Sequence, residues 1–96
     1  MQILVTYDVS TSSENGKRRL RRVAKICLDY GQRVQNSVFE CLVDPVQLVE
    51  LRERLLKAME LEHDSLRIYQ LGREWNHRVE HHGVKAAYDP QGLLMV

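Results

Sequence analysis

The sequence predicts a single α+β domain built from one β-sheet and two helices. Three observations support this expectation. Strand-like apolar segments flank two amphipathic helical segments, the segment before each helix contains capping residues, and no linker or repeat divides the chain. The chain has 96 residues, of which 44% are apolar. That size and composition are typical of one globular domain with a thin core.

The first strand is predicted over residues 2–8. Its side chains alternate, so that Ile3, Val5 and Tyr7 share one face. The carboxylate of Asp8 falls on the opposite face, together with the two even-numbered residues before it. Because both faces are largely apolar up to Asp8, this segment is expected to be a central strand of the sheet.

A helix is predicted to follow, from about residue 16 to residue 30. The loop over residues 9–16 is rich in Ser and Thr and offers several possible N-caps, and Gly31 is a suitable stop. Four apolar residues recur at helical spacing and define the inward face: Leu20, Val23, Ala24 and Cys27.

The middle of the chain predicts a hairpin and a second helix. Residues 32–35 and 38–43 are expected to be strands joined by a tight turn. Asp44 is a good N-cap and Pro45 is suited to the first helical position, and the helix is predicted to continue to about residue 61. Its inward face is expected to contain Leu48, Leu51, Leu55 and Met59.

Further strands are predicted toward the C-terminus. Residues 65–71 alternate as a strand, residues 72–76 are expected to form a loop, and residues 78–82 a short strand. The order of the first six elements is strand, helix, strand, strand, helix, strand. This is the ferredoxin-like pattern, with two helices on one face of a four-stranded antiparallel sheet and, here, an added C-terminal edge segment.

The other face of this sheet is expected to need a partner. It is predicted to be too apolar to face solvent, and a second copy of the chain is the simplest cover. The apolar tail over residues 84–96 is expected at the same dimer interface. No segment is long and apolar enough to cross a membrane and no signal peptide is visible, so a cytoplasmic protein is expected.

Positive charge is concentrated in the first helix. Between Lys17 and Arg33 there are seven basic residues and a single acid, whereas the second helical segment is acidic. A solvated helix face would explain a charge run of this kind. The absence of alternating acids instead favours binding to a phosphate backbone. The candidate contacts are Arg18, Arg19, Arg21, Arg22, Lys25 and Arg33.

Asp8 is the candidate catalytic and metal-binding residue. A carboxylate at the tip of a core strand, close to a basic helix, is a plausible place to hold Mg²⁺ against phosphates. One carboxylate alone makes a poor magnesium site, because this ion prefers six oxygens. The competing interpretation is that Asp8 caps the loop that follows it.

Two other patterns are interpreted structurally. Cys27 and Cys41 form no CxxC pair and are expected to be buried, reduced thiols. His77, Glu80 and His81 match the H-x-x-E-H signature of certain zinc proteases. That signature requires a helix, and this segment is predicted to be strand-like, so the match is interpreted as chance.

Three segments together resemble CRISPR-associated protein 2, the small subunit of the CRISPR spacer-acquisition machinery. They are the Ile3–Val9 strand with its Tyr-Asp end, the Arg19–Lys25 basic helix, and the Tyr30–Cys41 hairpin with its Gly-Gln-Arg-Val-Gln-Asn-Ser-Val-Phe-Glu run. The segment Asp64–Tyr69 agrees as well. The resemblance is close in the first half of the chain and becomes general after Gly72.

This resemblance implies a ferredoxin-like homodimer in which the two copies of Asp8 share one Mg²⁺. It implies a metal-dependent endonuclease acting on RNA or DNA, and a partner, the integrase CRISPR-associated protein 1. Tyr7, Arg33 and Phe39 fall on motif positions of the family, and Arg19 does so if the basic run is aligned accordingly. Two functions remain open: an endonuclease, or a structural adaptor that bridges integrase dimers and binds protospacer DNA. A relative of toxin ribonucleases with this fold is a third.

Overall fold

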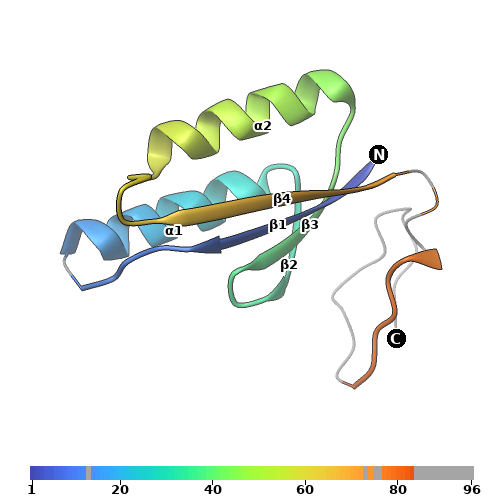
Figure 1. The fold of residues 1–96 in the computed structure, drawn as a ribbon, viewed down its shortest axis with the longest axis horizontal. Helices are drawn as coiled ribbons and strands as arrows, with labels where there is room; N and C mark the ends of the chain where they lie inside the picture. The colour runs from blue at the N-terminus through green and yellow to red at the C-terminus, as the bar shows by residue number, and fades with distance from the viewer. Residues whose placement is uncertain (13, 73, 75–76, 84–96) are drawn as a thin grey trace.

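The computed structural model describes residues 1–12, 14–72, 74 and 77–83. Its elements follow the predicted order (Figure 1). They are β1 (Gln2–Asp8), α1 (Glu14–Leu28), β2 (Gly31–Gln35), β3 (Val38–Leu42), α2 (Pro45–Ala58) and β4 (Ser65–Gly72). The four strands form one antiparallel sheet in the order β2-β3-β1-β4, which confirms the ferredoxin-like architecture.

Strand β1 is central and is held on both sides. Residues Gln2 to Thr6 pair with β3, and the pairing with β4 runs from Gln2 to Asp8. Ile3 and Val5 are fully buried and Tyr7 nearly so, as the alternation predicts. Two-sided pairing fixes the backbone of β1, and with it the direction in which the chain leaves the sheet after Asp8.

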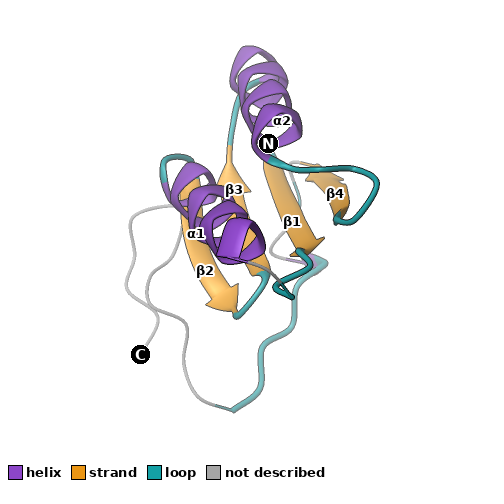
Figure 2. Cartoon of the chain, turned by 90° about the vertical axis from the view of Figure 1, so that its left-hand side faces the viewer, coloured by secondary structure: helices purple, strands orange, loops and turns teal. Residues whose placement is uncertain are grey.

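Both helices pack on the same face of the sheet, as Figure 2 shows. One continuous core joins the inward side chains of β1 and β3 to those of α1 and α2. The four inward residues predicted for α2 are buried, as are those predicted for α1 except Leu20, which is partly buried. No helix within the described part of the chain is long and apolar enough to cross a membrane.

Helix α2 begins as predicted and ends earlier than predicted. The backbone N–H of Gln47 donates to Asp44 Oδ1 at 2.7 Å, and the side chain of Gln47 accepts from the N–H of Asp44 at 2.9 Å. This capping box, with Pro45 in the first turn, fixes the start of the helix. The end lies at Ala58 rather than near residue 61, because Met59 is extended and the N–H of Glu60 donates to the Asp64 carboxylate.

The short strand predicted over residues 78–82 is not formed, so that prediction was wrong. Strand β4 ends at Gly72, whose φ of +80° turns the chain away from the sheet. Nη1 of Arg78 donates to the carbonyl of Leu71 at 2.8 Å, so a side chain takes an acceptor that an added strand would use. The predicted C-terminal edge segment over residues 84–96 lies outside the described residues.

The face of the sheet opposite the helices is open in part and less apolar than predicted, because polar and charged side chains share it with apolar ones: Thr6, Glu40 and Arg67. Leu42 is opposite Gln2 in the register, and Tyr69 is opposite Leu4, so all four share this face. Leu42 is 45% exposed and Tyr69 42%. These exposed side chains agree with the expectation that the open face takes part in association.

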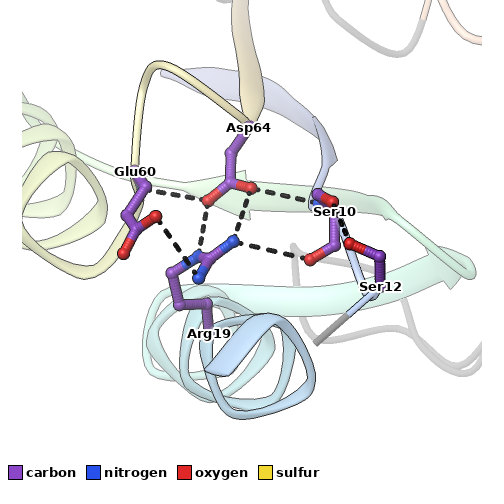
Figure 3. Close-up of polar contacts among 5 residues, drawn as sticks. All are labelled: Ser10, Ser12, Arg19, Glu60 and Asp64. Carbon is purple, nitrogen blue, oxygen red and sulfur yellow. Dashed lines mark hydrogen bonds and ion pairs between the residues drawn. The ribbon is translucent and has the colours of Figure 1, made fainter. Parts of the chain in front are cut away.

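A polar cluster ties the loop after β1 to α1 and to the turn before β4 (Figure 3). The side chain of Asp64 is fully buried and accepts from Nε of Arg19 at 2.9 Å and from Nη2 at 3.2 Å. It also accepts from the N–H of Ser10 at 3.1 Å and from that of Glu60 at 2.9 Å. The hydrogen bonds from Arg19 lower the pKa of this carboxyl most, and those from the two N–H groups lower it further. The pKa therefore lies below its ordinary value of 3.8, although burial acts to raise it.

Two adjacent leucines of α2 test which face of the helix packs into the core. Leu55 is fully buried, whereas Leu56 is 41% exposed. We expect Leu55→Ala to lower the free energy of unfolding by about 2–5 kcal/mol, since it removes packed methyl groups and leaves a cavity. Leu56→Ala is the matched control and should cost about 0.5 kcal/mol or less. Urea unfolding followed by circular dichroism measures both, and equal losses would contradict the assigned inward face.

The lowered pKa of Asp64 predicts how its contribution to stability depends on pH. The carboxyl stays charged in the folded protein at a pH where it is already protonated in the unfolded chain, so ionisation favours folding above the ordinary pKa of 3.8. The stability difference between wild type and Asp64→Asn should therefore be constant from neutral pH to about pH 4. It should shrink as the pH falls further. Urea unfolding across this range measures it, and a difference that grows on acidification would contradict the assignment.

Candidate metal and nucleic-acid site

Asp8 stands at the end of β1 with its carboxylate exposed. It lies on the face away from the helices, and its Cα partner across the sheet is Ser65 at the start of β4. Among the described residues, none hydrogen-bonds or pairs with this carboxylate. The loop-capping interpretation therefore finds no support, and the N–H of Ser10 donates to Asp64 instead. Asp8 thus presents its carboxylate to solvent from a fixed backbone.

The donor chemistry at Asp8 fits Mg²⁺, but one chain supplies little of it. A carboxylate oxygen is a ligand that Mg²⁺ prefers, and this ion keeps several waters. No group of three His, Cys, Asp or Glu side chains gathers anywhere in the described ranges. A site at Asp8 would therefore need further oxygens, from a second copy of the chain or from phosphates.

Two aromatic rings and a guanidinium form a stack on the opposite side of β1 from the Asp8 side chain: those of Tyr7, Phe39 and Arg33. The rings of Tyr7 and Phe39 lie 6.0 Å apart and nearly parallel, and the guanidinium of Arg33 lies 5.2 Å from the centre of the Phe39 ring. Burial raises the pKa of Tyr7, and the neighbouring Arg33 acts against this rise. Because Phe39 is fully buried and Tyr7 nearly so, these two rings support the core beneath β1. Arg33 is the exposed member of the group.

Four of the predicted basic contacts form a stripe on the outer face of α1. Their spacing follows the helical repeat and all four are exposed: Arg18, Arg21, Arg22 and Lys25. None of them forms an ion pair or a hydrogen bond with another residue in the part of the chain that the structure describes. We call these four residues the basic stripe. Its uncompensated charge remains available to an anion.

Arg19 differs from its neighbours. Its side chain is 13% exposed and its guanidinium contacts Asp64, with Glu60 Oε2 at 3.6 Å. The prediction that Arg19 binds nucleic acid stays a prediction, and the contact with Asp64 counts against it. Releasing Arg19 to a phosphate would leave the Asp64 carboxylate buried without its cation, which is strongly unfavourable.

One further carboxylate and two thiols are unsuited to act with Asp8: Glu40, Cys27 and Cys41. Burial raises the pKa of Glu40, with His81 acting against this rise, and Glu40 is opposite Leu4 in the register. Four residues along a strand span about 13 Å, so Glu40 is too distant to share a cation with Asp8 of the same chain. Cys27 and Cys41 are buried thiols whose pKa burial raises to about 12, which makes them unreactive at neutral pH.

The H-x-x-E-H match does not form a zinc site. His77 lies in a single 3₁₀ turn and Arg78 in a turn, and residues 79–82 have no regular structure. His81 and Glu80 are therefore not brought onto one helical face with His77, as the protease signature requires. Glu80 pairs with His82 instead.

Two residues in or beside the polar cluster are candidates that the sequence pattern does not reveal. Asp64 belongs to the acidic run at the end of the second helical segment, and nothing in that run indicates that its side chain is fully buried. Gly16 is the other case: a Cβ there would lie 1.9 Å from the carbonyl oxygen of Ser10. Both depend on contacts between separate segments of the chain, for which local periodicity gives no signal.

Comparison with known proteins places this geometry in a family. Residues 1–79 match the family described as CRISPR associated protein Cas2. The chain is 57% identical over 96 residues to the CRISPR-associated endoribonuclease Cas2 of Nitratidesulfovibrio vulgaris, covering all of this chain and 94% of that one. It is 56% identical over 95 residues to the CRISPR-associated endonuclease Cas2 of Halalkalibacterium halodurans, covering 99% of each.

The fold agrees with a solved structure. The crystal structure of Streptococcus pyogenes Cas2 at pH 6.5 superposes with a TM-score of 0.77 at 54% identity, covering 86% of this chain and 100% of that one. Sequence match, whole-chain identity and fold thus agree, and the chain belongs to the Cas2 family.

Proposed function

We propose that this chain is a homodimeric, Mg²⁺-dependent endonuclease of CRISPR adaptation that acts on RNA or DNA in the cytoplasm. The observation that carries the proposal is the exposed carboxylate of Asp8, without a partner among the described residues, at the end of the doubly paired strand β1. The names endoribonuclease and endonuclease of its relatives support the reaction class. The partly exposed apolar side chains on the open sheet face support a second copy as partner.

The chemistry divides between the ion and the side chains. When bound, Mg²⁺ polarises a phosphoryl oxygen and lowers the pKa of a coordinated water. Asp8 of each copy would hold the ion, which also relieves the repulsion between two neighbouring carboxylates. The basic stripe would bind the flanking phosphates and place the strand without reading its sequence.

A second candidate function is a structural adaptor. The basic stripe favours it, because four uncompensated cations bind a duplex whether or not Asp8 holds a metal. In this role the dimer would hold protospacer DNA and bridge two dimers of the integrase, CRISPR-associated protein 1. The two functions differ in their dependence on Asp8, which the following experiments exploit.

Asp8→Asn tests the nuclease. It keeps the shape of the side chain and removes the charge that binds the cation. We expect cleavage of RNA or DNA in Mg²⁺ to fall at least about a hundredfold, since metal stabilisation of several kcal/mol is removed. Wild type with EDTA should behave in the same way. The control is Asp29→Asn, an exposed acid that follows α1 and pairs with Arg54 on the surface, which should cleave normally. Unchanged cleavage by Asp8→Asn would refute the nuclease and leave the adaptor.

The basic stripe predicts a salt dependence. In the variant with Arg18→Gln, Arg21→Gln and Arg22→Gln, the slope of log affinity against log salt for duplex DNA should fall by about 0.9 for each phosphate that the variant no longer neutralises. Fluorescence anisotropy in graded NaCl measures it. Arg52→Gln, which removes an exposed arginine of α2, is the control and should leave the slope unchanged. Equal slopes for all three proteins would exclude the stripe as the binding surface.

A further inference from the structure

Asp64 is a buried carboxylate that the proposed chemistry does not use. Its side chain is fully buried, yet it remains charged because it accepts four hydrogen bonds. Two of them come from the fork of Arg19 and two from backbone N–H groups. A carboxylate this well satisfied holds its neighbours in one arrangement, because any displacement would leave charge buried and unpaired.

The cluster holds the chain segment that follows Asp8 from two sides. Ser10 donates its N–H to Asp64 Oδ1 at 3.1 Å, and its carbonyl accepts from Nη2 of Arg19 at 3.5 Å. Figure 3 shows both contacts converging on Ser10. Both polar groups of the Ser10 backbone are thus bound by the two partners of a single ion pair.

Helix α1 confines the Ser10 segment from a third side. A Cβ on Gly16 would lie 1.9 Å from the carbonyl oxygen of Ser10 and 3.0 Å from the Cα of Thr11. Only glycine lets the helix approach the loop so closely. The loop is therefore confined by the helix as well as by Arg19 and Asp64.

The cluster adjoins Asp8 through two segments of the backbone. Ser10 is two residues after Asp8 along the chain, and Asp64 directly precedes Ser65, the Cα partner of Asp8. The Asp8 carboxylate itself has no partner among the described residues. Its position therefore depends on the backbone around it, which the pairing with Ser65 holds on one side and the cluster at Ser10 holds on the other.

We propose that Asp64 is a positioning residue for the Asp8 site, acting with Arg19 by fixing the Ser10 backbone. This inference rests on the proposed function in so far as Asp8 binds a metal. Its own content is that the buried ion pair sets the direction of the Asp8 carboxylate. Groups that hydrogen-bond a metal ligand change metal affinity by about ten- to a hundredfold when removed, and a group that acts through the backbone is expected at the lower end of that range.

The experiment uses the full chain and two readouts. The first is titration with Mn²⁺ alone, with free ion followed by electron paramagnetic resonance. The second is amide hydrogen exchange of residues 9–12 without metal. In Asp64→Asn we expect Mn²⁺ affinity to fall about tenfold or more and exchange in this loop to speed up by a similar factor. Arg19→Lys keeps the charge but removes the fork, and should give smaller changes of the same sign.

Controls separate positioning from general destabilisation. Leu55→Ala weakens the core outside the cluster and should leave both readouts within about twofold of wild type. Equal effects in Leu55→Ala and Asp64→Asn, or wild-type exchange in folded Asp64→Asn, would overturn the inference. If Asp64→Asn does not fold, Arg19→Lys decides by the same criteria. If Asp8→Asn binds Mn²⁺ as wild type does, the proposed metal site fails, and the exchange readout alone decides the positioning role.

Discussion

The structure depends on the pairing of β1 with both of its neighbours. This strand carries the most buried side chains of the sheet, receives the helices on one face, and ends at the residue best suited to chemistry. A short domain has a thin core, so a carboxylate at the end of its best-held strand needs only the few contacts beyond the sheet that the Asp64 cluster supplies. A loop carboxylate would need other contacts to hold it.

Elements and inward faces could be predicted from the sequence because they depend on local rules. Alternation identified the buried face of β1, and the Asp44-Pro45 pair identified the start of α2. The end of α2 could not be predicted, because a carboxylate four residues further along competes for the N–H of Glu60. Residues 78–82 have strand-like composition, but the side chain of Arg78 takes the acceptor of the edge strand. Contacts outside the local pattern overrode local preference in both places.

The same distinction separates Arg19 from the basic stripe. Consecutive residues of a helix point about 100° apart, so one run of arginines is divided between solvent and the interior of the fold. Charge counting treats them alike. Only the position of Asp64, brought to α1 by the turn before β4, gives Arg19 a buried carboxylate partner, whereas the basic stripe has none among the described residues. The location of Asp8 could be predicted from sequence, whereas the contacts that fix the loop after it could not.

The limited chemistry of a single chain bears on what the protein does. One carboxylate binds Mg²⁺ weakly, whereas a two-fold axis doubles the donors without any further residue. Metal occupancy would then depend on association, and association on the open sheet face where Tyr69 is exposed. Phosphate binding by the stripe, if it occurs as proposed, would need no such assembly. A scaffold role therefore requires less of this chain, because it needs no metal and no defined dimer geometry. In a nuclease role, the dimer geometry and the cluster proposed to orient Asp8 would both belong to the active site.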